Sequence, residues 1–201
     1  MLERRSALAA HPHAKPGERI GLATTGPAAV TLGEWRPVNI LQISAFAASI
    51  EAAGTQLAET LGIALPAPNR WSGEPHRNLR AVAPGVWLAV GVEWALPDAA
   101  SLRARLAEAA TVVDLSHART ALRISGSAAT RALNQHCGLD LSDAQFPAGS
   151  ATNTRFGHIG MTLARLDDKP TLEVLVFRGY AEFVFDALID GAREFGVVIG
   201  E

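Results

Sequence analysis

With 201 residues, 48% of them hydrophobic, the chain is long enough for one or two compact domains with cores of their own. The formal net charge of −2 and the lack of a basic run longer than Arg4-Arg5 argue against nucleic acid or an anionic membrane as a partner, and no stretch reaches the roughly 18 apolar residues of a membrane span. The only cysteine, Cys137, cannot form an internal disulfide, so we expect a cytoplasmic protein.

Residues 1–37 carry scattered proline, glycine and threonine with only weak periodicity. A segment of this kind buries little surface by itself. We therefore expect an extended N-terminal arm that is either mobile or laid along another surface.

Residues 38–117 predict a first α+β unit with the order β-α-β-β-α-β. Apolar runs and alternating patterns indicate strands at 38–44, 78–82, 86–90 and 111–115. Helical spacing of apolar residues indicates helices at 50–61 and about 98–106. Gly62 supplies a left-handed C-cap for the first helix, Asp98 is a favourable N-cap for the second, and Pro84-Gly85 predicts a turn between the middle strands.

Residues 118–201 repeat that order as a second α+β unit. The expected strands are 119–124, 159–163, 172–176 and 197–199. The expected helices are 127–136 and about 180–195, with a loop at 140–150 after the first of them. Two such passes predict an α+β fold of two ferredoxin-like βαββαβ units, packed together or interleaved.

Side chains that could carry chemistry are isolated from one another. Neither G-x-G-x-x-G nor a P-loop occurs, so nucleotide binding by a known motif is not expected. Asp114, Ser116 and His117 are near neighbours at a strand end, whereas the three groups of a catalytic triad converge through tertiary structure. His11 and His13 form an H-x-H pair without a second group of ligands nearby. We expect no catalytic, cofactor-binding or metal-binding residue.

Several short runs together resemble one protein family. They are LRISG at 122–126, CGLDL at 137–141, FPAG at 146–149, the R-x-x-H-I pattern at 155–159 and, upstream, VWLAVGVEWAL and LPAPNR. Over about residues 38–196, and in this order, the chain resembles the gamma subunit of heterotetrameric sarcosine oxidase. The N-terminal arm matches that family least.

The resemblance implies a noncatalytic subunit of a flavoenzyme that oxidatively demethylates sarcosine to glycine. In such an enzyme the alpha subunit binds NAD and has a region for tetrahydrofolate, the beta subunit carries FAD and FMN, and the delta subunit binds zinc. The gamma subunit carries no cofactor, and its fold is similar to folate-binding aminomethyltransferase domains. No residue of this chain is carried over as a folate ligand.

Six residues are interface candidates for a subunit of this kind. Trp35 and Trp71 lie in loop-like segments, where a large aromatic side chain can anchor a partner. Arg155, His158, Arg178 and Tyr180 occupy strand and helix-entry positions that need a polar partner.

Three alternatives remain open at this point. Related complexes that demethylate N-methylglutamate or dimethylglycine use similar subunits. A stand-alone folate-dependent one-carbon transferase would need a buried carboxylate facing a folate cavity, for which the sequence offers no distinctive residue. The chain could also be an adaptor for an unrelated enzyme, which would lack flavin.

Overall fold

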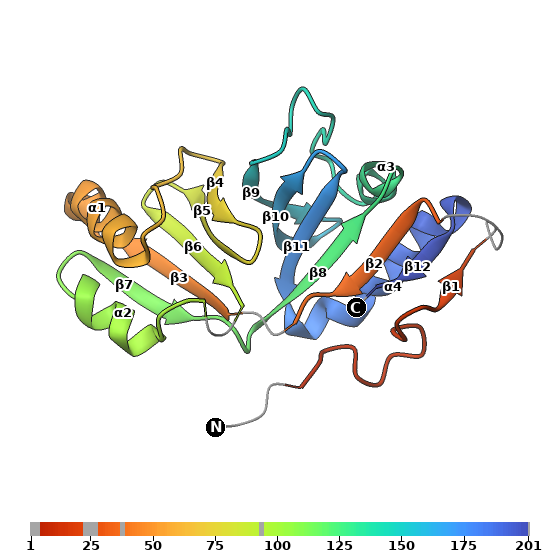
Figure 1. The fold of residues 1–201 in the computed structure, drawn as a ribbon, viewed down its shortest axis with the longest axis horizontal. Helices are drawn as coiled ribbons and strands as arrows, with labels where there is room; N and C mark the ends of the chain where they lie inside the picture. The colour runs from red at the N-terminus through yellow and green to blue at the C-terminus, as the bar shows by residue number, and fades with distance from the viewer. Residues whose placement is uncertain (1–4, 22–27, 37–38, 93–94, 201) are drawn as a thin grey trace. The chain divides into compact units, whose positions relative to one another are not determined.

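The computed structural model describes residues 5–21, 28–36, 39–92 and 95–200, and the chain divides into two compact units. Unit 1 contains residues 1–36 and 118–201, and unit 2 contains residues 37–117. Each unit has one sheet with helices packed on one face (Figure 1). The α+β class with two ferredoxin-like units is therefore confirmed.

The sheet of unit 2 has five antiparallel strands in the order β4-β5-β6-β3-β7. These strands are β3 (Asn39–Ala45), β4 (Trp71–Glu74), β5 (Arg77–Ala83), β6 (Val86–Gly91) and β7 (Ala110–Asp114). The helices are η1 (Ala47–Ser49), α1 (Ile50–Leu61) and α2 (Ala99–Leu106). The apolar side chains of α1 and α2 meet those of β3, β5, β6 and β7 in one core, which includes Leu57, Leu102, Ile43 and Trp87.

Local signals set the helix ends of unit 2. The Asp98 carboxylate accepts hydrogen bonds from the backbone N–H groups of Ala100 and Ser101 at 3.0 and 2.9 Å, which caps α2. Gly62 ends α1 with φ 62°, a backbone conformation that favours glycine. Both caps were expected from the sequence.

The sheet of unit 1 has seven strands in the order β1-β12-β2-β8-β11-β10-β9. These are β1 (Arg19–Ile20), β2 (Val30–Glu34), β8 (Arg119–Ser125), β9 (Ala151–Phe156), β10 (Ile159–Asp167), β11 (Thr171–Phe177) and β12 (Val197–Ile199). The helices are α3 (Ala129–Asn134), η2 (Arg178–Tyr180), α4 (Ala181–Ala192) and η3 (Arg193–Phe195). Helices α3 and α4 pack on the face that carries Leu122, Ile124 and Val174.

The two sheets share one topology, and the unit 1 sheet has two further strands: β2, inserted in the sheet, and β1, paired with β12 at its edge. The run β9-β10-β11-β8 in unit 1 corresponds to β4-β5-β6-β3 in unit 2. In unit 2, β7 pairs directly with β3, whereas in unit 1 β2 lies between β8 and β12. Strand β2 is antiparallel to β8 and parallel to β12. Residues 1–36, called the N-terminal segment from here on, thus contribute strands to the unit 1 sheet.

This insertion differs from the separate arm that we expected over residues 1–37. Val30 and Leu32 are fully buried and Thr31 between them is exposed, so β2 alternates as a half-buried strand does. Two apolar residues are too few to reveal a strand by periodicity, and both partner strands lie in the second half of the chain. Residues 1–36 consequently belong to the same compact unit as residues 118–201.

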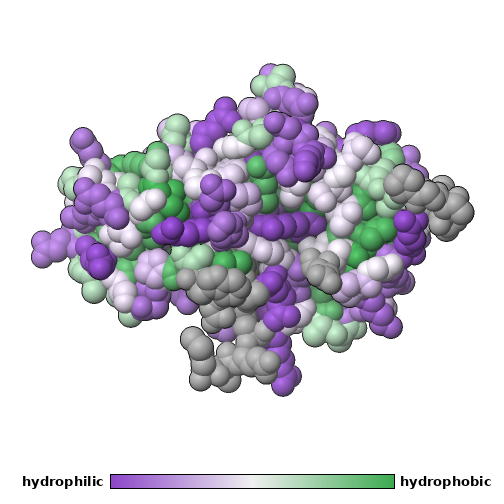
Figure 2. All heavy atoms as spheres, viewed as in Figure 1, coloured by the Kyte–Doolittle hydropathy of each residue, from purple (hydrophilic) through white to green (hydrophobic). Residues whose placement is uncertain are grey.

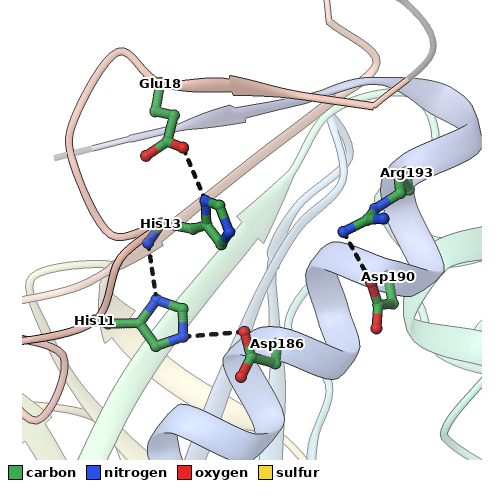
Figure 3. A network of polar contacts seen from close by, with 6 residues as sticks. All are labelled: His11, His13, Glu18, Asp186, Asp190 and Arg193. Carbon is green, nitrogen blue, oxygen red and sulfur yellow. Dashed lines mark hydrogen bonds and ion pairs between the residues drawn. The ribbon is translucent and has the colours of Figure 1, made fainter.

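Polar contacts fasten the N-terminal segment to α4 (Figure 3). His11 Nε2 lies 3.0 Å from Asp186 Oδ1, and His11 Nδ1 accepts a hydrogen bond from the backbone N–H of His13 at 3.2 Å. Because Nδ1 is the acceptor, the neutral ring carries its proton on Nε2 and donates it to Asp186. His13 Nδ1 lies 2.9 Å from Glu18 Oε1. His11 therefore fastens the segment to α4, and His13 makes a contact within the segment.

Arg165 organises the loop that carries the FPAG run. Its side chain is 2% exposed, and Nη2 lies 2.7 Å from Asp143 Oδ1. Nη1 donates to the carbonyl of Phe146 at 3.1 Å, and Nε donates to that of Asp167 at 3.2 Å. One buried guanidinium thus joins the loop to the end of β10.

Candidate partner-binding surfaces

The residues at the end of β7 that suggest a triad are Asp114, Ser116 and His117, and the first two make hydrogen bonds to the backbone. The Ser116 hydroxyl accepts the backbone N–H of Ile40 at 2.9 Å, and Asp114 Oδ1 accepts the backbone N–H of Ser116 at 2.8 Å. Ser116 is 2% exposed and His117 is exposed, so the hydroxyl is not presented to a substrate. These contacts fix a strand end and assemble no triad.

The other reactive side chains are also engaged within the fold. His136 stacks on Phe156 with ring centroids 4.7 Å apart, and Cys137 is buried in the core of unit 1. His11 and His13 each pair with a carboxylate of their own. Among the residues that the structure describes, no group of three or more His, Cys, Asp or Glu side chains could hold a metal ion.

Trp35, an interface candidate, follows β2 and lies on Arg123. The guanidinium carbon of Arg123 is 3.6 Å from the Trp35 ring centre, and the backbone N–H of Trp35 donates to Ala121 at 2.9 Å. Arg123 Nε donates to Glu173 Oε2 at 2.8 Å, and Glu173 is fully buried. Trp35 is half-buried, so its ring both supports the sheet and remains partly available.

Trp71 begins β4, which is an edge strand of unit 2 and was expected as a loop. The side chain is half-buried, and the residue lies opposite Arg80 in the pairing with β5. The strand was not expected because its sequence, WSGE, lacks alternating apolar residues.

Arg155 and His158 belong to the β9–β10 hairpin, at one edge of the unit 1 sheet. Arg155 belongs to edge strand β9 and pairs with Gly160, while His158 occupies the turn between β9 and β10. Both side chains are exposed. The hairpin therefore presents two polar side chains at one end of the sheet.

Arg178 and Tyr180 belong to η2, at the junction of β11 and α4. Arg178 Nη2 donates to the carbonyl of Ser6 at 3.2 Å, so this side chain has a partner in the N-terminal segment. Tyr180 is 50% exposed, and Phe177 and Phe183 on either side are also exposed. The sequence pattern does not mark Phe177 as exposed, whereas Phe183 lies off the apolar stripe of the last helix, which is a signal for exposure.

Unit 2 has an apolar groove beside the LPAPNR run. The cavity has a volume of about 410 Å³ and is lined by Ile50, Leu65, Pro66, Pro68, Pro84 and Trp87, among others. Ile50 and Leu65 are 40% and 43% exposed. A Cβ atom on Gly54 would approach a methyl carbon of Leu65 to 2.8 Å, which shows how closely Leu65 packs over α1. Figure 2 shows that apolar residues reach the surface in separate patches on the face drawn.

The fold defines a class of α+β proteins with paired ferredoxin-like units. The glycine cleavage system aminomethyltransferase T from Bartonella henselae has this fold, with a TM-score of 0.61 and 16% identity over 86% of this chain and 48% of that one. The sequence then specifies the family more closely. The chain belongs to the sarcosine oxidase gamma subunit family, whose model matches residues 43–194.

Two similar proteins come from Corynebacterium. The sarcosine oxidase subunit gamma of Corynebacterium sp. strain P-1 is 30% identical over 154 residues, which cover 75% of this chain and 70% of that subunit. The heterotetrameric sarcosine oxidase from Corynebacterium sp. U-96, solved in complex with pyrrole 2-carboxylate, contains a chain with a TM-score of 0.81 and 28% identity. That match covers 96% of both chains. The resemblance inferred from the short sequence runs is confirmed.

No helix among the described residues is long and apolar enough to cross a membrane.

Proposed function

We propose that this chain is the gamma subunit of a cytoplasmic heterotetrameric sarcosine oxidase and assembles with alpha, beta and delta subunits. The observation that carries this proposal is the likeness to a chain of the Corynebacterium sp. U-96 enzyme over 96% of both chains. A likeness of that extent includes the N-terminal segment and both units.

In this proposal the chain supports the chemistry of other subunits. FAD and FMN are held by the beta subunit, NAD and tetrahydrofolate by the alpha subunit and zinc by the delta subunit. This chain carries none of them. The engagement of His11, His13 and Ser116 in contacts of the fold supports a structural role.

The six sequence-derived candidates belong to the proposed interface. Arg155, His158 and Tyr180 are exposed, and Trp35 and Trp71 are half-buried, so part of each side chain reaches the surface. Arg178 contributes by orienting the N-terminal segment through Ser6. Arg178→Ala should weaken assembly and leave the unit 1 fold intact; unchanged co-purification with the other subunits would remove Arg178 from the interface.

The substrate is tested with the assembled complex. We would co-express this chain with the alpha, beta and delta subunits encoded in the same genome and measure oxidation of sarcosine, N-methylglutamate and dimethylglycine. Sarcosine should give the highest kcat/KM. A clear preference for one of the other two amino acids would assign the complex to that related reaction, and a complex without flavin would reject the oxidase role.

A further inference from the structure

Three exposed aromatic side chains surround the junction of β11 and α4. Phe177, Tyr180 and Phe183 are 47%, 50% and 61% exposed. They recur at every third residue from the end of β11 through η2 into α4. Side chains three residues apart at a helix start are neighbours, which relates Tyr180 to Phe183, while Phe177 is the strand residue directly before η2. We call these three residues the α4-entry patch. Exposed apolar clusters of this kind mark contact surfaces.

Arg119 adds a charge to the α4-entry patch. It lies directly opposite Phe177 in the pairing of β8 with β11, and its guanidinium carbon is 3.7 Å from the Phe177 ring centre. Partial burial lowers the pKa of Arg119 from its usual value, because lost hydration disfavours the charged form. Arginine nevertheless stays protonated at neutral pH.

Among the described residues of unit 1, the Arg119 guanidinium lies against the Phe177 ring and forms no ion pair and no side-chain hydrogen bond. A half-buried guanidinium with five donors is best matched by a carboxylate, which binds it in a bidentate geometry. An acidic side chain of a partner would therefore complement this cation.

The size of the α4-entry patch fits the centre of one interface. A buried aromatic side chain covers about 150–250 Å², so three half-exposed rings offer about 300 Å². A standard interface takes about 800 Å² from each protein, with aromatic residues and arginine enriched at its centre. The patch is therefore the right size for the centre of an interface and too small to be a whole one.

We propose that the α4-entry patch and Arg119 are the centre of the surface by which this chain docks on a larger subunit, which presents apolar side chains and a carboxylate opposite Arg119. This inference rests on the proposed role as an oxidase subunit. A symmetric pair of copies of this chain fits less well, because it would bring two Arg119 cations into the same contact.

The test uses the full chain and the purified alpha, beta and delta subunits of sarcosine oxidase from the same genome. The variants are Tyr180→Ala with Phe183→Ser, and Arg119→Glu. The control is Phe46→Ser, because Phe46 is 46% exposed on unit 2. We expect the Kd of each patch variant for the purified subunits to be about thirtyfold higher than that of the unmodified chain, which is the size of effect seen at a central hot-spot residue. The Kd of the control should stay within about twofold of the unmodified value.

The outcomes separate the two proposals. If the unmodified chain binds none of the subunits, both the oxidase role and the docking surface are rejected. If it binds and the patch variants bind with the same Kd, or Phe46→Ser weakens binding equally, the docking surface alone is rejected. A homodimer that the patch variants abolish would reject the larger subunit as the occupant.

Discussion

The guanidinium of Arg123 lies between the ring of Trp35 and the carboxylate of Glu173. The distances are 3.6 Å to the Trp35 ring centre and 2.8 Å from Nε to Glu173 Oε2. Because Arg123 and Glu173 are paired across β8 and β11, this stack joins the N-terminal segment to two central strands of unit 1. An aromatic residue chosen from the sequence as a partner anchor thus also supports its own sheet.

Trp35→Ala should lower the free energy of unfolding by about 1 kcal/mol, because it removes a half-exposed cation–π contact. Trp35→Phe keeps an aromatic ring over Arg123 and should lose less. Urea denaturation of the two variants and the unmodified chain measures this. Equal stability of all three would show that the stack contributes nothing in solution.

Leu32→Ala tests the insertion of β2 between β8 and β12. Leu32 is fully buried in the core of unit 1, so its truncation should cost about 2–5 kcal/mol. Thr31→Ala is the matched control in the same strand, since Thr31 is exposed and should change stability by less than about 0.5 kcal/mol. Similar denaturation midpoints for the two variants would contradict the assignment of β2 to this sheet.

Arg165→Ala should destabilise the chain by about 3 kcal/mol, because it leaves the buried carbonyl of Phe146 without its donor. Asp143→Asn should cost less than about 1 kcal/mol, since the Asp143 side chain is 90% exposed. Thermal melts compare the two. A larger loss for Asp143→Asn would mean that the ion pair, and not the carbonyl contacts, holds the 140–150 loop.

The α2 cap predicts a pH dependence. Hydrogen bonds from the Ser101 side chain and from the backbone N–H groups of Ser101 and Ala100 hold the pKa of Asp98 below its ordinary value of 3.8. Because the folded pKa is the lower one, the cap contributes stability above pH 3.8 and loses it as the pH falls through the folded pKa. Asp98→Ala should therefore lower the Tm at pH 7 more than at pH 2; an equal shift at both values would exclude the carboxylate as the cause.

The repeated strand and helix order was predictable because each element has enough residues to show its period. Helix α1 carries the buried residues Ala53, Leu57 and Leu61 at helical spacing, and Asp98 is an N-cap residue that predicts the start of α2. Strands β1, β4 and β9 were not expected. They are short or polar edge strands, so hydrogen bonds to their neighbours determine them more than their own alternation does.

The candidate surface was predictable only in part. Tyr180 and Arg178 stand out as residue types typical of interfaces, whereas Phe177 fits a core equally well until its exposure is known. Only the place of Phe183 off the apolar stripe of the last helix distinguishes it from a core residue. Arg119 gave no local signal, because its place beside Phe177 depends on the register between β8 and β11. That Arg119 forms no ion pair with the described residues of unit 1 is likewise a property of tertiary structure.

The most direct test of the central claim is a pull-down with the tagged full chain, co-expressed with its genomic neighbours, followed by native mass measurement and a visible spectrum. The account predicts a yellow complex that contains this chain with three other subunits and oxidises an N-methylated amino acid. A lone folded monomer that binds a reduced folate and retains no flavin-containing partner would contradict it.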